Sequence, residues 1–137
     1  MPSLPPGIAE ARLAQARIGR LATVTPDGRP HVVPVCFALH DGRIFTAVDA
    51  KPKATRALQR LENVRAHGSA SLLVDHYDDD WTKLWWVRVD GAATIEESEA
   101  GLDALAAKYA QYRAQRPAGP LIAIAPENWR TWIASEP

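Results

Sequence analysis

The stretch RLATVTPDGRPHVVPVCFALHDGRIFTAVD, Arg20 to Asp49, decides the fold expected for this chain. Three runs rich in β-forming residues are separated by Pro26 to Gly28 and by His40 to Gly42, and an Asp-Gly pair between such runs is typical of a tight turn. Strands joined by loops this short pair in the antiparallel sense. The stretch therefore predicts three consecutive antiparallel strands. Pro34 is expected at a bulge or a sheet edge, because proline cannot donate to a ladder.

The segments on either side alternate between helical and strand patterns. Helices are predicted for Ile8 to Arg17, Lys53 to Arg65 and the segment from Ser98 to Tyr112. Strands are predicted for Ser69 to Tyr77, Leu84 to Asp90, Leu121 to Ala125 and Trp129 to Ala134. Gly91 closes the strand that begins at Leu84, and Ala92 to Glu96 continues or re-pairs it. A doubly wound parallel sheet would need a crossover helix between nearly every pair of strands, and those helices are missing. The order predicts a mainly β fold, in which a small antiparallel barrel carries helices on its outside.

The composition is that of one ordinary globular domain spanning residues 1–137. The 16 basic and 16 acidic side chains balance, so the chain has no overall electrostatic attraction to nucleic acid or to an anionic membrane. Cys36 is the only cysteine, which excludes an intrachain disulfide and a cysteine-based zinc site. No basic start followed by an apolar run is found, and no apolar run approaches the ~20 residues that cross a bilayer. These features favour a cytoplasmic protein.

The segment KPKATRALQR follows a strand and opens a helix. At 100° per residue, Lys53, Arg56 and Arg60 fall within a narrow arc beside the apolar stripe of that helix. Free N–H groups and the helix dipole attract anions to a helix start, where Lys51 and Lys53 are unfavourable unless a phosphate is bound. Thr55 can add a hydroxyl donor. The pattern indicates a phosphate site, and the alternative is a solvated basic helix face.

The segment LWWVRVD contains the second candidate feature, the pair Trp85 and Trp86. Neighbouring strand residues point to opposite faces of a sheet, so the two indoles cannot both fill the interior. One of them must face outward, where a partner subunit or a planar cofactor would cover it. The alternative is that the outward tryptophan packs under a helix of the same chain.

The remaining candidates carry little chemistry. A bulge at Pro34 would present backbone groups to a ligand, although a packing irregularity is the more common cause of a proline in a strand. The four histidines lack zinc-ligand spacing, and Asp78 to Asp80 lack the pattern of a calcium loop, so no metal site is expected. Cys36 has no nucleophile context, and no glycine-rich phosphate loop or dinucleotide fingerprint is present. The sequence gives no support to a hydrolase or a kinase.

Three segments together resemble known proteins. Arg20 to Val35 resembles the opening hairpin of the pyridoxamine-phosphate-oxidase-like split-barrel families, and Lys51 to Val64 resembles their phosphate-binding segment. SLLVDHYDDDWTKLWWVRVDG, Ser71 to Gly91, is the most specific segment and looks most like the actinobacterial branch of F420-dependent oxidoreductases. The similarity extends from Arg12 to Trp132. It implies a six-stranded antiparallel split β-barrel of the FMN-binding type, with flanking helices.

The resemblance also implies a symmetric homodimer with two cofactor sites at its interface. The phosphate of the deazaflavin coenzyme F420 would meet Lys51, Lys53 and Arg56, together with Arg60. The tricyclic ring would lie on the strand around Val33, Pro34 and Val35, and Trp85 or Trp86 would reach the site from the partner chain.

The function that the resemblance implies is hydride transfer between the deazaflavin ring and a small electron-poor substrate, with the protein binding and orienting the cofactor. No acid or base is assigned. An FMN-dependent oxidase or reductase on the same fold, and a non-catalytic carrier of a planar ligand, remain as alternatives. Relatives often have Asn-Pro-Arg where this chain has His67 to Ser69. That departure predicts a lower cofactor affinity or a different cofactor preference.

Overall fold

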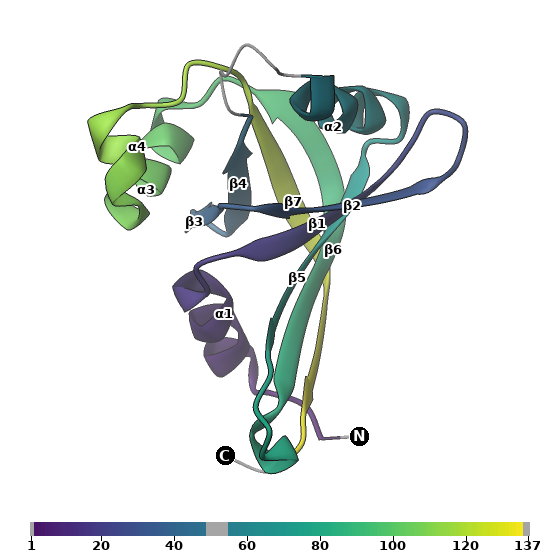
Figure 1. Cartoon of the computed structure of the whole chain (residues 1–137), viewed down its shortest axis with the longest axis vertical. Helices are drawn as coiled ribbons and strands as arrows, with labels where there is room; N and C mark the ends of the chain where they lie inside the picture. The colour runs from purple at the N-terminus through teal and green to yellow at the C-terminus, as the bar shows by residue number, and fades with distance from the viewer. Residues whose placement is uncertain (1, 49–54, 136–137) are drawn as a thin grey trace.

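The computed structural model describes residues 2–48 and 55–135, and for residues 55–58 it describes the backbone alone. Four α-helices, one short 3-10 helix and seven strands follow one another along the chain (Figure 1). In chain order they are α1 (Pro6–Gln15), β1 (Gly19–Val24), β2 (Pro30–Val35), β3 (Ala38–His40), β4 (Arg43–Ala47), α2 (Thr55–Ala66), β5 (Ser69–His76), η1 (Trp81–Lys83), β6 (Trp85–Glu96), α3 (Glu99–Lys108), α4 (Ala110–Ala114) and β7 (Leu121–Ile133). None of the described helices combines the length and the apolar character that crossing a membrane requires.

All seven strands form one antiparallel sheet in the order β2-β1-β5-β6-β7-β4-β3. The sheet curls around its own core as a half-barrel with helices on its flanks, so the predicted mainly β, antiparallel split-barrel architecture is confirmed. The predicted number of strands, six, is wrong. The strands β2 and β3 are the two edges of the described sheet, although they are neighbours in the sequence.

A break in the second predicted strand accounts for β3. Between β2 and β3, the backbone N–H of Phe37 donates to the hydroxyl of Tyr109 (3.1 Å), and the Phe37 carbonyl accepts from Lys108 Nζ (2.8 Å). Side chains of α3 and its C-cap thus take the hydrogen bonds that a neighbouring strand would otherwise make. Because the Phe37 ring is also fully buried, the chain turns at this residue and continues as a separate edge strand.

The last two predicted strands are one strand, β7, and this too corrects the prediction. The sheet accommodates an irregularity where Asp90 pairs with Asn128 but Gly91 pairs with Pro126, which leaves Glu127 as the extra residue of a β-bulge. The same bulge lets Pro126 sit inside a long strand. The helix predicted from Ser98 to Tyr112 is likewise interrupted: Tyr109 adopts an extended conformation (φ −117°, ψ 121°) and separates α3 from α4.

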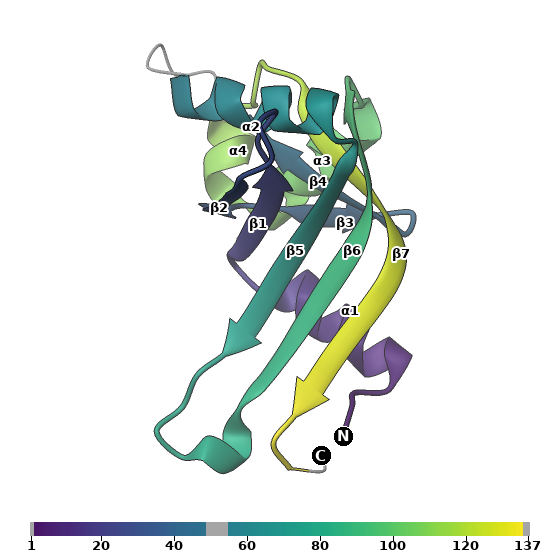
Figure 2. The same cartoon turned by 90° about the vertical axis from the view of Figure 1, so that its right-hand side faces the viewer.

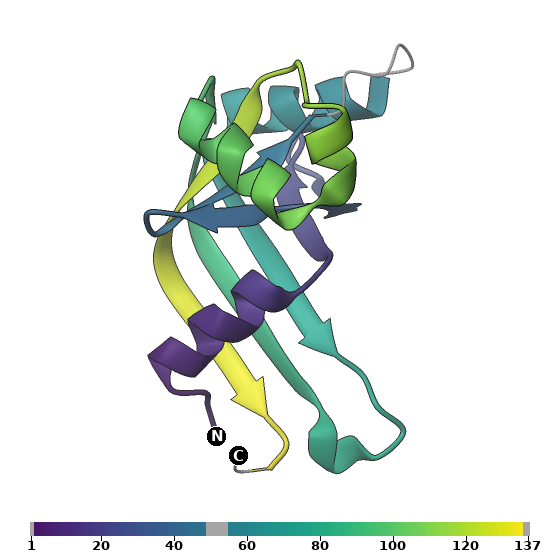
Figure 3. The same ribbon diagram turned by 90° about the vertical axis from the view of Figure 1, so that its left-hand side faces the viewer.

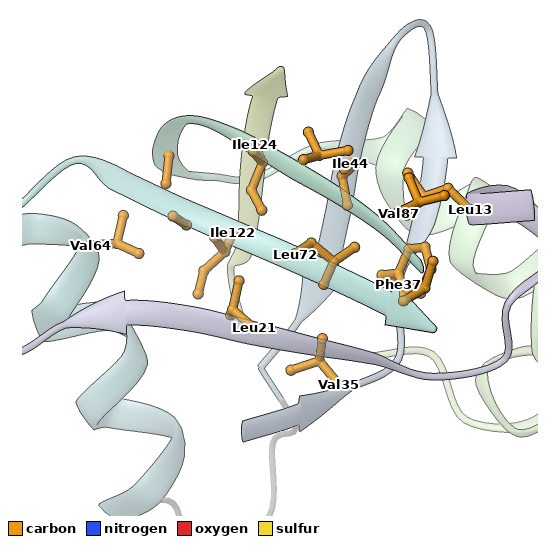
Figure 4. Close-up of a cluster of buried hydrophobic side chains, with 14 of the residues drawn as sticks. Leu13, Leu21, Val35, Phe37, Ile44, Val64, Leu72, Val87, Ile122 and Ile124 are labelled. Carbon is orange, nitrogen blue, oxygen red and sulfur yellow. The ribbon is translucent and has the colours of Figure 1, made fainter. Parts of the chain in front are cut away.

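The core consists of two clusters of buried side chains. The larger one fills the inside of the curled sheet and includes Leu21, Phe37 and Leu72 (Figure 4). Helix α1 closes it from one side through Ala9 and Leu13, and crosses the long strands β5, β6 and β7 (Figure 3). The smaller cluster lies beneath α3 and α4, where Phe45, Leu105 and Leu121 meet; it is thus on the opposite face of β4.

Candidate functional site

Helix α2 is held on the sheet by a buried chain of polar side chains. Gln59 Nε2 donates to Asn63 Oδ1 (2.7 Å), and Asn63 Nδ2 donates to the hydroxyl of Thr23 on β1 (3.0 Å). Asn63 is fully buried and Thr23 is 4% exposed, so leaving either group unpaired would carry the full cost of desolvation. Leu61 and Val64 bury the apolar side of the same helix. The position of α2 over β1 is therefore specified by both packing and directional bonds.

The segment that departs from the family pattern closes the other end of α2. The Nε2–H of His67 donates to the carbonyl of Thr25 at the start of the β1–β2 turn (2.9 Å). Gly68 follows, and its carbonyl accepts from the N–H of Ala93 on β6 (3.0 Å). His67 thus ties the helix end to the hairpin, and Ser69 begins β5.

Three of the predicted phosphate residues lie in the first two turns of α2, at the opposite end of this helix. Lys51 and Lys53 lie outside the described residues. Thr55 and Arg56 occupy the first turn of α2, where the structure describes only the backbone. Arg60, one turn further, is half-buried, and none of the described ion pairs involves it. The helix placement of Thr55, Arg56 and Arg60 agrees with the prediction, whereas their contact with a phosphate stays a prediction.

The strand predicted to carry the cofactor ring is the edge strand β2. It pairs with β1 in an unbroken register from Pro30 to Val35, so Pro34 sits at a sheet edge and not at a bulge. Val33 is half-buried and packs against the larger core cluster, Val35 is buried, and Pro34 is exposed on the opposite face. Only Pro34 of the three therefore presents its side chain to the surroundings of one isolated chain.

The position of His31 was not predicted from the sequence. This residue pairs with Thr23 across β1 and β2, and directly opposite residues share a face, so His31 lies on the same face as the bonds that hold α2. Its ring nitrogen Nδ1 is buried and has no hydrogen-bond partner among the described residues. An orphaned buried polar atom needs a partner, either water or a ligand group. The unpaired Nδ1 of His31 is thus compatible with a polar ligand that reaches the space beside β2.

Trp85 and Trp86 lie on opposite faces of β6, as the alternation predicted. Trp85 packs against the larger core cluster, with its ring stacked on His76 at 6.1 Å between centroids. Trp86 pairs with Asp75 and Trp132 on the other face. Both tryptophans lie on β6, which two strands separate from β2, and at the end of β6 far from α2 (Figure 2). A single chain therefore does not bring the tryptophan pair to the predicted phosphate site.

One broad surface of the sheet carries no helix over strands β5 to β7 (Figure 2). We call it the outer face, and it consists of alternate residues of five strands: Val32 and Pro34 of β2, Arg20, Ala22 and Val24 of β1, Ser71, Leu73 and Asp75 of β5, Trp86, Arg88 and Asp90 of β6, and Asn128, Arg130 and Trp132 of β7. Val32 is 60% exposed and Val24 is 38% exposed. Exposed apolar side chains on one contiguous surface are typical of an interaction site.

Two ion pairs lie on the outer face, and Arg130 adds a further cation there. Arg20 contacts Asp75 at 2.7 Å, and Arg88 holds Asp90 through two bonds of 2.9 and 3.1 Å. Burial raises the pKa of Asp90, but the hydrogen bonds from Ser71 and Arg88 outweigh it, so the pKa lies below its usual value. The carboxylate is thus kept ionised, and the face offers apolar side chains among satisfied charges.

No group of three or more metal-ligating side chains occurs in residues 2–48 and 55–135. The candidate site is therefore built from a basic helix start, an edge strand, an orphaned histidine nitrogen and a separate aromatic pair.

Comparisons with solved structures recover the same fold. The conserved hypothetical protein Rv2991 of Mycobacterium tuberculosis matches with a TM-score of 0.79 and 24% identity, covering 96% of this chain and 86% of that one. A FAD-binding protein of Mesorhizobium loti matches with a TM-score of 0.68 and 22% identity over 95% of both chains. The heme storage protein HutZ of Vibrio cholerae matches with a TM-score of 0.65 and 17% identity, covering 96% and 95%. A search of the curated proteins finds no match.

The family comparison is more direct. The model of the family described as pyridoxamine 5'-phosphate oxidase matches residues 7–133, nearly the whole chain. The half-barrel topology, the anchored helix α2 and this match lead to one conclusion: the chain belongs to the pyridoxamine 5'-phosphate oxidase family.

Proposed function

We propose that this protein is an oxidoreductase that binds coenzyme F420 in a homodimer and acts on a small electron-poor substrate. When bound, the deazaflavin ring supplies the hydride chemistry. The protein binds the cofactor, orients its ring and excludes water from it. The observation that carries the proposal is the anchoring of α2, which the Gln59–Asn63–Thr23 chain holds on β1.

In this proposal the start of α2 holds the cofactor phosphate. Lys51, Lys53 and Arg56 supply positive charge, Thr55 supplies a hydroxyl, and Arg60 adds a cation that no described carboxylate neutralises. A helix start that is fixed against the sheet loses little freedom on binding, which favours affinity. The ring lies along Val33, Pro34 and Val35. The unpaired Nδ1 of His31 offers the ring a polar contact on the face of β2 that His31 shares with Val33 and Val35.

The partner subunit completes the site. Because Trp85 and Trp86 are remote from α2 within one chain, either can serve the site only from a second copy. The outer face supports such a copy, because it exposes apolar side chains among paired charges of both signs and can thus meet its own image across a two-fold axis. We assign no residue as a proton donor or acceptor. The balanced net charge and the absence of a membrane-crossing helix in the described part favour a cytoplasmic location.

FMN is the alternative cofactor, because it also joins a tricyclic ring to a phosphate. The Mesorhizobium loti neighbour is a FAD-binding protein, which adds support for a flavin. The resemblance of Ser71 to Gly91 to F420-dependent oxidoreductases favours the deazaflavin. A carrier without turnover is the other alternative, and the heme storage function of HutZ shows that a protein of this fold can have a storage role.

Titration of the purified protein with F420 and, separately, with FMN tests the proposal. The readout is quenching of tryptophan fluorescence, which is sensitive here because the chain has five tryptophans. We expect saturable quenching by F420 and not by FMN, followed by oxidation of reduced F420 by an electron-poor substrate. Saturable quenching by FMN alone would indicate that the protein is an FMN-dependent oxidase or reductase. Tight binding without turnover across a broad substrate panel would indicate a carrier, and no response to either cofactor would refute the proposal.

Charge reversal tests the phosphate site. The double variant Lys53→Glu with Arg56→Glu should abolish F420 binding, because it replaces two attractive charges near the phosphate with two repulsive ones. Arg65→Glu is the matched control, since Arg65 is exposed in the last turn of the same helix. It should bind as the wild type does. Unchanged binding by the double variant, with a circular dichroism spectrum like that of the wild type, would show that the phosphate lies elsewhere.

A further inference from the structure

A cavity of about 300 Å³ lies on the inner side of the sheet, at the end opposite α2. Helix α1 covers the lower halves of β5, β6 and β7 there, and the β5–β6 connection with η1 lies below it (Figure 3). The lining residues are Arg12 of α1, His76 of β5, Thr82, Lys83 and Leu84 in and after η1, Trp85 of β6, Ile133 of β7, and Ser135. None of them belongs to the outer face or to the start of α2, and Trp85 alone is also a candidate for the proposed cofactor site.

Among the residues that the structure describes, the cavity is lined by basic and neutral groups only. Arg12 and Lys83 face it, no carboxylate is among its lining residues, and neither cation takes part in an ion pair within the described residues. Arg12 is half-buried and Lys83 is exposed, and two cations directed into one concave space repel each other unless an anion balances them. The lining therefore favours a negatively charged occupant.

The acidic residues nearby do not neutralise these cations. Asp80 accepts hydrogen bonds from the backbone N–H and the hydroxyl of Thr82 (3.1 and 2.7 Å), which hold its pKa below the usual value and direct it toward its own loop. Asp78 accepts from the N–H of Asp80 (2.7 Å), and Asp75 pairs with Arg20 on the outer face. Arg12, Lys83 and the hydroxyl of Ser135 remain as donors toward the cavity.

The aromatic residues His76 and Trp85 line one side of the cavity and favour a flat ligand. The Trp85 ring is stacked on His76, with 6.1 Å between ring centroids and an interplanar angle of 16°, and the guanidinium carbon of Arg12 lies 5.0 Å from the Trp85 ring centroid. Leu84 and Ile133 add apolar surface. A flat apolar body can pack against these groups while a carboxylate meets the cations.

We propose that this cavity binds a small planar aromatic carboxylate, with the carboxylate held by Arg12 and Lys83 and the ring packed against Trp85. The site belongs to one chain and needs no cofactor. Binding at this cavity can therefore be tested without F420, and its failure would not count against the proposed F420 function.

Calorimetric titration of the cofactor-free protein with 2-naphthoate tests the site. We expect saturable one-to-one binding with a Kd on the order of 1 mM or tighter. The neutral isostere 2-naphthamide should bind at least about tenfold more weakly, since it cannot pair with the two cations. Equal binding of the two compounds, or no saturation by the carboxylate, would overturn the proposal.

Substitutions locate the binding. Arg12→Gln and Lys83→Gln should each weaken 2-naphthoate binding several-fold, and the double variant by at least about tenfold. Arg29→Gln is the matched control, because Arg29 is an exposed arginine in the β1–β2 turn, remote from the cavity. The indole N–H resonance of Trp85, assigned by its loss in Trp85→Phe, should shift on addition of 2-naphthoate. An unshifted resonance, or variants that bind as the wild type does, would refute the site.

Discussion

At the residue scale, Lys108 is a half-buried cation that binds the backbone where the chain leaves β2. Its Nζ donates to the carbonyl of Phe37 (2.8 Å) and lies 3.8 Å from the centroid of the Phe37 ring. Burial, together with the positive charge of Arg17, lowers the pKa of Lys108 to about 8, although Cys36 acts in the opposite direction. The residue that terminates the hydrogen-bonding of β2 is thus an ammonium group held where its charge is disfavoured.

This lowered pKa predicts that the protein becomes more stable as the pH rises from about 8 toward 10. In that window the unfolded chain keeps Lys108 protonated, with a pKa near 10.5, whereas the folded chain releases the proton, so stability increases with pH. Urea unfolding at several pH values between 8 and 10 measures the effect. The window ends at pH 10 because burial raises the pKa of Tyr109, which makes its contribution to stability fall at higher pH.

Two variants isolate the contribution of Lys108. Lys108→Met removes the titrating group and should lack the rise, while Lys83→Met, at an exposed position, should retain it. The same rise in Lys108→Met would assign the pH dependence to another residue.

At the level of elements, the pairing of β6 with β7 depends on a glycine. Gly91 pairs with Pro126 next to the bulge at Glu127. A Cβ atom at Gly91 would collide with the carbonyl oxygen of Ala125 and would lie 2.8 Å from its carbonyl carbon. These are backbone atoms of the neighbouring strand, which cannot move without displacing the ladder. The close approach of two backbones explains why a residue without a side chain is needed here.

Gly91→Ala should therefore lower the free energy of unfolding by about 1–3 kcal/mol, the usual range for overpacking a well-packed site. Denaturant unfolding measures the change. Gly7→Ala is the control, because nothing lies within 4 Å of a Cβ added at Gly7 in α1. It should leave stability equal or slightly higher. A Gly91→Ala variant as stable as the wild type would mean that β7 can shift away from β6 at the bulge.

At the scale of the whole molecule, the outer face is the surface on which we propose that a second copy of the chain binds. Helix α1 covers the inner face of the long strands and α3 and α4 cover the second cluster, yet no described helix lies over the outer face of β5, β6 and β7. Apolar side chains from five strands remain there among paired charges. In the proposed homodimer, a second copy of the chain would bury these side chains, Trp86 among them.

Val32→Asp should convert the proposed dimer into a monomer. Val32 is 60% exposed, so the substitution leaves the fold of one chain intact while placing an unpaired charge in the interface. Light scattering after size exclusion should give a mass near twice 15.0 kDa for the wild type and near 15.0 kDa for the variant. Ile8→Asp, at an exposed position of α1 that is not on the outer face, should remain dimeric. A Val32→Asp variant that remains dimeric would exclude this face as the interface.

The pattern of residues was sufficient for the local features. Two Asp-Gly turns imposed antiparallel hairpins, the helical spacing from Lys53 to Arg65 predicted α2, and strand alternation placed Trp85 and Trp86 on opposite faces. These follow from sequence because turn geometry and side-chain periodicity are properties of a few neighbouring residues. The family resemblance followed from segments of the same kind.

The tertiary structure decided what depends on residues far apart in the sequence. The split between β2 and β3 arises because Lys108 and Tyr109 bind the Phe37 backbone, 71 and 72 positions away. The bulge joining the last two strands, the Asn63–Thr23 bond beneath α2 and the cavity between Arg12 and Lys83 are likewise long-range. A hydrogen bond or a cavity requires two surfaces to meet, and only the packing of the whole chain determines which surfaces do.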